Sequence, residues 1–192
     1  GGWRGARTIM DLFEEERNDN VAGYIVRMWH VEDLMRAHGF ELDDVRGALV
    51  DELSGSPDQK AVALAFYRSV IERMKQEGIQ TSGHLNEVNE TMHDLESLHQ
   101  ALIEVVKEPE YIRLFEAAVP GILALEEHAP RDDDRGPIET CFTGIYGVML
   151  LKAQGRQLSP GTLDADKHIR ELLEALSKHY RNMRKLPGVS LN

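Results

Sequence analysis

The sequence predicts an all-α protein, in which a helical bundle of about seven helices surrounds a central apolar helix. Apolar residues recur every three or four positions over long segments, the period of a helix that buries one face. No segment shows the sustained alternation of apolar and polar residues that is typical of a strand. Glycine and proline stand between these segments, so the individual helices can be bounded.

The predicted central helix covers residues 138–151, the one stretch that is apolar on nearly every side. A helix of this kind belongs in the protein interior. Gly136 and Pro137 introduce it, because proline suits the first helical position, and Gly155 suits its end. It is too short to span a bilayer, which takes about 20 residues. We therefore expect the other helices to pack around it.

Three helices are predicted in the first part of the chain, over residues 10–17, 21–38 and 43–53. The Asn-Asp-Asn run that ends at Asn20 supplies capping residues for the second of them, and Gly39 ends it. Asp43 and Asp44 start the third, and the Ser-Gly-Ser-Pro sequence after Leu53 breaks it.

Four further helices are predicted over residues 57–77, 81–107, 110–128 and 159–184. Ser56 and Gln59 match a capping box around a first-position proline. Thr81 and Ser82 are placed to open the next helix, and the Glu-Pro pair at Pro109 forces a boundary. Ser159 is followed by proline in the same way.

Composition limits the classes of function. The chain has 33 acidic and 22 basic residues and a formal net charge of -11, which opposes non-specific binding to nucleic acid or anionic membranes. We expect neither partner. The single cysteine, Cys141, has no disulfide partner, and we find no secretory or transmembrane pattern, so the predicted location is the cytoplasm.

The predicted domain organisation is simple. A chain of 192 residues with 42% apolar content suits one folded domain, which we assign to residues 10–186. Residues 1–9 lack apolar periodicity and are interpreted as an upstream extension or residues left from expression. Residues 187–192 are expected to form a flexible tail.

Glu32 is the first candidate for chemistry, because it falls in the middle of an apolar helix face. A carboxylate there loses much hydration free energy unless it is paired or protonated. Arg36 lies one turn further along the same helix and is a partner of the right charge. Two structural interpretations stay open: a buried pair of Glu32 with Arg36, and a carboxylate at a packing seam with another helix.

Histidines raise the question of a metal site. His84 and His99 lie on the inward stripe of the helix predicted over 81–107, and that helix carries two Glu-x-x-His pairs, which end at His93 and His99. Di-iron bundles use this pair on two different helices, whereas both copies here lie on one. A mononuclear site with one histidine and Glu32 or Glu139 stays open. We predict no metal and no cofactor, and interpret the two inward histidines as bonded core residues.

Two residues of the central helix complete the candidate set. Glu139 lies in its first turn, where the helix dipole favours a negative charge, and Tyr146 lies two turns later with a hydroxyl that a carboxylate or histidine can bind. Nucleophilic catalysis has little support, because Cys141 has no evident activating base. The candidate buried polar cluster therefore comprises Glu32, Arg36, His84, His99, Glu139 and Tyr146.

Several motifs together carry a family resemblance: 20–24 (NVAGY), 28–37 (MWHVEDLMRA), 83–85 (GHL), 94–99 (DLESLH), 138–142 (IETCF) and 146–147 (YG). With them, the chain from Met10 to about Tyr180 resembles the bacterial domain-of-unknown-function 4924 family. The resemblance implies an all-helical fold that starts near Met10. That family has no assigned activity or catalytic residues, so the resemblance carries no function to this chain.

Two hypotheses follow for an otherwise unknown function. The first is a non-enzymatic helical protein that acts through self-association or a protein partner, based on the amphipathic last helix with a basic end at Lys178, Arg181, Arg184 and Lys185. The alternative is a small-molecule or metal-binding protein, or an enzyme, that uses the candidate cluster around a pocket.

Overall fold

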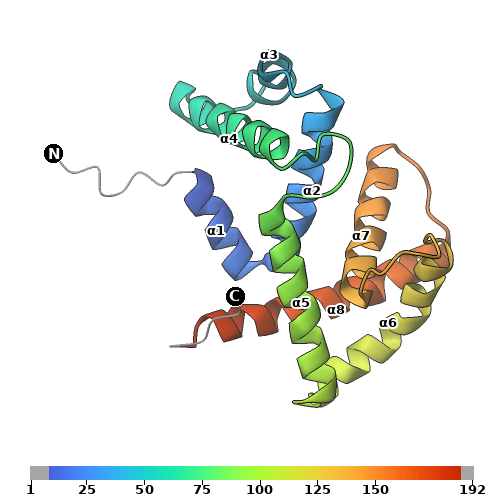
Figure 1. Cartoon of the computed structure of the whole chain (residues 1–192). Coiled ribbons are helices and arrows are strands. Elements are labelled where there is room, and N and C mark those ends of the chain that lie inside the picture. Colours follow the sequence, from blue (N-terminus) through green and yellow to red (C-terminus); the bar gives the residue numbers. More distant parts are fainter. Residues whose placement is uncertain (1–8, 187–192) are drawn as a thin grey trace. The chain divides into compact units, whose positions relative to one another are not determined.

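The structure of the chain is a computed structural model that describes residues 9–186, with side chains from residue 13 onward. Within that range it contains eight α-helices, one short π-helix and no strand, which confirms the all-α class (Figure 1). The predicted extension over residues 1–9 lies outside this range except for Ile9, which begins the first helix, and the predicted tail over 187–192 lies outside it entirely. The helices are α1 (Ile9–Asp19), α2 (Val21–Ala37), α3 (Leu42–Val45), η1 (Arg46–Val50), α4 (Pro57–Gln76), α5 (Asn86–Glu104), α6 (Pro109–Glu127), α7 (Pro137–Ala153) and α8 (Pro160–Arg184).

The chain forms two compact units, which are described separately. The first unit holds the chain up to residue 17 and residues 23–89, and the second holds residues 18–22 and everything from residue 90 onward. The boundaries fall inside α1, α2 and α5, so these helices contribute to both units. A single domain over residues 10–186 stays a prediction.

The first unit is built on the apolar faces of α2 and α4. Ile25 and Met35 of α2 and Met74 of α4 are fully buried, and Val45 carries the core into α3. The helix expected over 43–53 is divided into α3 and the π-helix η1, both of which contact α4. The predicted capping box of α4 is confirmed, because Ser56 and Gln59 exchange side-chain to backbone hydrogen bonds.

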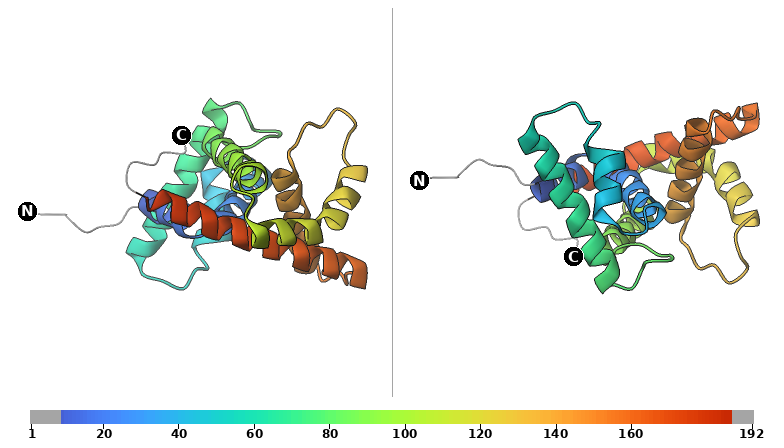
Figure 2. Two further views of the ribbon diagram at one scale, coloured as in Figure 1. Left: turned by 90° about the horizontal axis from the view of Figure 1, so that it is seen from below. Right: turned by 90° about the horizontal axis from the view of Figure 1, so that it is seen from above.

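The second unit consists mainly of α6, α7, α8 and most of α5. The α6 and α8 helices lie side by side, as the views of Figure 2 also show, and α7 contacts both. Gly121 allows the close contact of α6 with α8, because a Cβ there would lie 3.1 Å from Cβ of Ala165. In the same way Gly144 leaves room on α7 for Leu125 of α6.

The α7 helix begins at Pro137 as expected and ends two residues beyond the predicted position. Its buried residues include Ile138, Cys141, Phe142 and Ile145, whereas Tyr146 is half-buried. Its role as the centre of the whole bundle stays a prediction. None of the described helices combines the length and apolar character that crossing a membrane requires.

Candidate functional site

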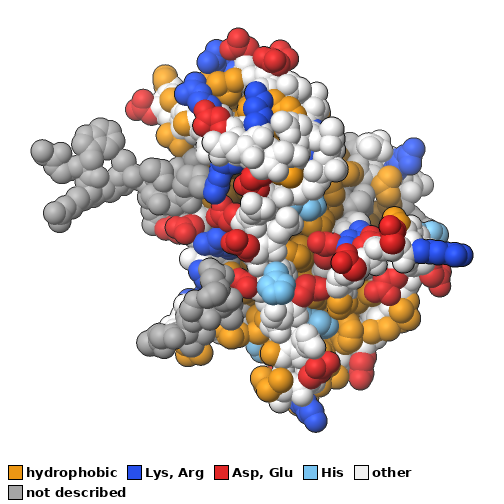
Figure 3. Space-filling model, viewed as in Figure 1, with side chains coloured by type: hydrophobic (Ala, Val, Ile, Leu, Met, Phe, Trp, Pro, Cys, Tyr) orange, Lys and Arg blue, Asp and Glu red, His pale blue; other side chains and the backbone are white. Residues whose placement is uncertain are grey.

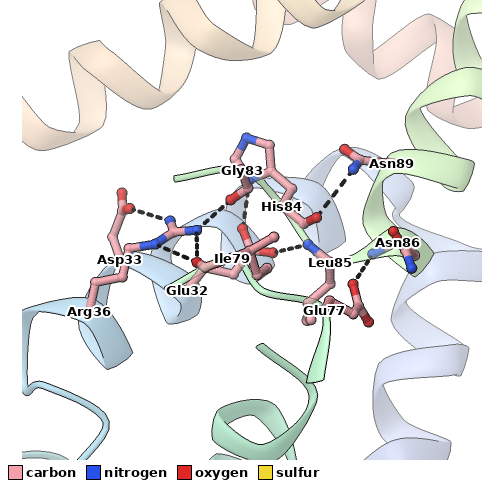
Figure 4. A network of polar contacts seen from close by, with 10 residues as sticks. All are labelled: Glu32, Asp33, Arg36, Glu77, Ile79, Gly83, His84, Leu85, Asn86 and Asn89. Carbon is pink, nitrogen blue, oxygen red and sulfur yellow. Dashed lines mark hydrogen bonds and ion pairs between the residues drawn. The ribbon is translucent and has the colours of Figure 1, made fainter. Parts of the chain in front are cut away.

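The most organised polar site lies in the first unit, where the segment between α4 and α5 passes α2 (Figure 4). Gly78 and Gly83 adopt the left-handed backbone conformation there, with φ of 70° and 96°, which favours glycine. The expected helix start at Thr81 is therefore wrong, and α5 begins at Asn86. The residues between the two helices form a turn that carries His84.

Glu32 has no exposed surface and uses both carboxylate oxygens. Its Oε1 lies 2.7 Å from Nδ1 of His84, and its Oε2 accepts a hydrogen bond of 2.8 Å from the backbone N–H of Leu85. The second bond satisfies an N–H at the start of α5 that has no acceptor within that helix. Glu32 thus fixes both the histidine and the beginning of the helix after it.

The ring of His84 is held from two directions. It is bonded to Glu32 and stacks on the indole of Trp29, with ring centroids 4.6 Å apart and planes 10° from parallel. An ionised carboxylate only accepts hydrogen bonds, so in a bond to that form Nδ1 of His84 is the donor. The other nitrogen, Nε2, points away from the carboxylate (Figure 4) and is an acceptor in the neutral ring. The His84 side chain is 31% exposed.

Arg36 secures the same segment from the other side. Its Nη2 donates to the carbonyl oxygens of Ile79, at 2.9 Å, and of Gly83, and its Nη1 contacts Asp33. Of the two interpretations left open for Glu32, the pair with Arg36 is not the one found, since the guanidinium binds the turn and the carboxylate binds His84 and Leu85 (Figure 4). The carboxylate and the guanidinium therefore act separately on one segment of backbone.

The second unit contains a different buried pair. His99 of α5 is 6% exposed, and its Nδ1 lies 2.6 Å from the hydroxyl of Tyr111 on α6. Burial lowers the pKa of His99 to about 4, so the ring is neutral at pH 7. Burial also raises the pKa of Tyr111, so the phenol keeps its proton. The pair is a neutral hydrogen bond inside the core.

The other two predicted residues also belong to the second unit. Glu139 lies in the first turn of α7, as expected, and Tyr146 lies two turns further on the same helix; both are half-buried. The structure thus brings Glu32, Arg36 and His84 together in the first unit. Convergence of all six residues of the candidate cluster on one site stays a prediction.

Glu96 has a role that the sequence analysis missed. Its Oε1 accepts a hydrogen bond from the backbone N–H of Ile138, at the start of α7, and the N–H of Glu139 also binds this carboxylate. Burial raises the pKa of Glu96, although both backbone donors oppose this shift. A Cβ on Gly136 would overlap the carboxylate, at 1.2 Å from Oε2. The signal in the sequence is Gly136 itself, an N-cap residue with no side chain to accept a bond.

These sites have limited chemical capacity within the described chain. No group of three or more His, Cys, Asp or Glu side chains among the described residues is arranged to hold a metal ion. Burial raises the pKa of the Cys141 thiol to about 12, which disfavours the nucleophilic thiolate. The feature best suited to chemistry is the acceptor nitrogen of His84, oriented by Glu32 in the manner of a general base or a metal ligand.

Comparison with known proteins gives a family and no activity. The family model for a domain of unknown function, number 4924, matches residues 10–186. No curated protein and no solved structure matched the chain. Because the family model covers nearly the whole sequence, the resemblance that its motifs predicted is confirmed. The chain belongs to the domain-of-unknown-function 4924 family.

Proposed function

We propose that this protein is non-enzymatic and acts by association, with a second copy of the chain as its partner. The supporting observation is a surface at one end of the second unit that combines two exposed valines with exposed and half-buried basic side chains. We call this surface the valine–basic end and define it by Val105, Val106, Lys178, Arg181 and Lys185.

The valine–basic end joins two helix termini. Val105 and Val106, which follow α5, are 79% and 62% exposed. Three residues further, Glu108 lies 3.9 Å from His179 of α8, so the valines and the basic end of α8 occupy the same end of the unit. Two adjacent valines with this exposure lose contact with water only when another surface covers them.

Charge favours a second copy as that surface. The chain as a whole has a net charge of -11, so a basic end is a local exception that complements the acidic remainder of another copy. The main polar groups of this site are already bound, because both oxygens of Glu32 and two nitrogens of Arg36 hold the turn, and the third nitrogen of Arg36 binds Asp33. This use of the candidate residues supports a structural role for them.

Native mass spectrometry and light scattering between about 1 and 100 μM test the proposal, because association by mass action depends on protein concentration. We expect a concentration-dependent dimer or larger oligomer that weakens with added salt. The double substitution Val105→Asp and Val106→Asp introduces buried charge into the interface and should leave the monomer at every concentration. The same spectrum reports any mass retained with the folded protein.

Leu53→Asp and Val62→Asp are the matched controls, since these residues are 47% and 38% exposed and lie in the first unit. They should leave association unchanged. Equal loss of association in the controls would place the interface elsewhere. A strictly monomeric protein at high concentration, with no protein retained in pull-downs, would overturn the proposal, whereas a specific heteromeric complex would replace the second copy by another protein partner.

A second candidate, binding of a small molecule or metal at the candidate cluster, is favoured by one observation. The His84 ring is fixed by Glu32 and Trp29 while 31% of its side chain stays exposed. Residues that position a ligand often lower the free energy of unfolding, whereas structural residues raise it. Glu32→Gln and His99→Asn should therefore leave the free energy of unfolding unchanged or raise it if the cluster serves a ligand.

Under the association proposal the same substitutions have the opposite effect. Each removes a partner from a buried hydrogen bond, so each should lower the free energy of unfolding by about 2 kcal/mol or more in urea titrations. Retained extra mass on the native protein, together with unchanged stability of both variants, would favour the ligand-binding function over association.

A further inference from the structure

A cleft in the first unit is independent of the turn that carries His84. It encloses about 460 Å³ between α1, α2 and α4, a volume within the range of small-molecule sites. Its apolar surface is formed by Phe13, Val31, Leu34, Ala63, Phe66 and Tyr67. The two phenylalanines stack on each other with centroids 4.2 Å apart, so the apolar wall of the cleft includes a packed aromatic pair.

The polar groups of the cleft lie on its α1 and α2 sides. Arg27 and His30 are exposed and stand one turn apart on the helix face that also carries Val31 and Leu34. Glu16 of α1 pairs with Arg27 through Nε, at 3.3 Å, and the Arg27 side chain is 59% exposed. Among the described residues, Arg27 forms no ion pair or hydrogen bond other than this contact through Nε.

The two terminal guanidinium nitrogens of Arg27 define the kind of group that the rim accepts. A guanidinium binds a carboxylate or sulfonate through a pair of parallel N–H donors, and the terminal pair is one such fork. His30 adds a further donor beside it. Burial raises the pKa of Tyr67, so its hydroxyl stays protonated and is also a donor. Glu16 is the acidic group of this rim, and Arg27 already neutralises it.

The cleft and the Glu32 site occupy different sides of α2. Arg27 and Glu32 are five positions apart, which places them about 140° apart around the helix at about 100° per residue. Val31 and Leu34 follow the Arg27 side, and Glu32 faces the turn before α5. Substitutions in the cleft can therefore be made without touching the residues that hold His84.

We propose that this cleft binds a small, flat, apolar molecule that carries one anionic group, with its ring system against Phe13 and Phe66 and its anion on Arg27. The site is separate from the association surface of the second unit. It requires no second copy of the chain, so ligand binding and self-association can fail independently.

Two fluorescent probes of nearly the same shape test the proposal. 8-Anilino-1-naphthalenesulfonate is a flat aromatic anion, and N-phenyl-1-naphthylamine lacks the sulfonate. We expect the anionic probe to bind the full chain with a dissociation constant of about 10–100 μM, the range that ligand efficiency gives for a molecule of this size. The neutral probe should bind about tenfold more weakly, because it forms no bond with the guanidinium.

Arg27→Gln separates the two parts of the site. It should weaken the anionic probe about tenfold and leave the neutral probe unchanged, since only the charged fork is lost. Arg113→Gln is the control, because Arg113 is an exposed arginine of the second unit that is likewise paired with a glutamate. It should change neither probe. Equal weakening of both probes by Arg27→Gln would overturn the assignment of the anion.

Ala63→Phe fills the cleft and should abolish binding of both probes, while Ala61→Phe, at an exposed position of the same helix, should leave both unchanged. Circular dichroism of each variant excludes binding to a partly unfolded state, which also enhances the fluorescence of the anionic probe. Absence of saturable binding to the native chain, or undiminished binding to folded Ala63→Phe, would overturn the proposal.

Discussion

In two helices of this protein, α5 and α7, a carboxylate from elsewhere in the chain holds the first residues. Comparing them distinguishes a carboxylate that only anchors a helix from one that also positions a side chain. Neither α5 nor α7 has a capping side chain of its own, because Leu85 and Gly136 stand at their starts. In each case a carboxylate from an earlier helix supplies an acceptor. Glu32 binds the N–H of Leu85 just before α5, where Glu77 also binds the N–H of Asn86, and Glu96 binds the N–H of Ile138 in α7. Both anchors connect parts of the chain that are more than 40 residues apart in sequence.

The two anchors differ in what else they hold. Glu32 is completely buried and binds both a backbone N–H and the imidazole of His84. Glu96 is half-buried, binds only backbone, and requires a glycine at position 136. The same device thus fixes a helix start in the second unit and, in the first, also positions a side chain. Complete burial and the imidazole partner make the Glu32 anchor the stronger of the two.

Of the changes considered, removal of the two carboxylates should give the largest difference in the free energy of unfolding. Glu32→Ala should lower the free energy of unfolding by about 4 kcal/mol, because it leaves a backbone N–H and an imidazole N–H without their buried acceptor. Glu96→Ala should cost about 1 kcal/mol, the usual value of a lost helix cap. Urea unfolding at pH 7 measures both. Equal losses in the two variants would show that the His84 contact adds nothing to the anchor.

Acid should affect the second unit through His99. Its pKa is about 4 in the folded chain and about 6.5 when unfolded, so between pH 6.5 and 4 mainly the unfolded state takes up the proton. Stability from this residue is therefore lost as the pH falls from 6.5 to 4, by about 3 kcal/mol. Urea unfolding at several pH values measures the loss, and His99→Asn should flatten it.

Glu96 opposes this acid effect, which gives a control within the same unit. Its pKa is raised in the folded state, so the folded chain takes up this proton before the unfolded chain does, and the change stabilises the fold as the pH falls. Glu96→Gln should therefore steepen the loss of stability as the pH falls. A pH profile unaltered by His99→Asn would assign the acid sensitivity to other groups.

The helices could be predicted because neighbouring residues in the sequence set their boundaries. The carboxylate anchors could not, because each joins residues that are far apart in the sequence. Ser56, Gln59 and Pro57 lie within four residues of each other and define the start of α4. The start of α5 depends on Glu32, and no rule of local spacing connects residues 32 and 85. An inward carboxylate was recognisable from its apolar neighbours, but the sequence left its partner open between Arg36, the nearest opposite charge along the helix, and a group on another helix.

Substitution of Gly136 should have an effect of intermediate size on stability, and it tests the Glu96 anchor directly. Gly136→Ala places a methyl group on the Glu96 carboxylate and should cost about 2 kcal/mol, from the displaced cap and local overpacking. In the background of Glu96→Ala the same substitution should cost almost nothing, because the methyl group then meets no carboxylate. The double-mutant cycle in urea isolates this interaction. Additive effects would show that Gly136 is required by the backbone and not by Glu96.

The smallest expected effect is on the same helix, at Gly147. A Cβ there meets no atom within 4 Å, so Gly147→Ala should raise the free energy of unfolding by about 0.5–1 kcal/mol through helix propensity alone. Thermal unfolding at low and high protein concentration measures the change. A loss of stability at both would mean that α7 is packed on this side also, as its predicted central position requires. A loss confined to high concentration would place a second copy on this face, away from the valine–basic end.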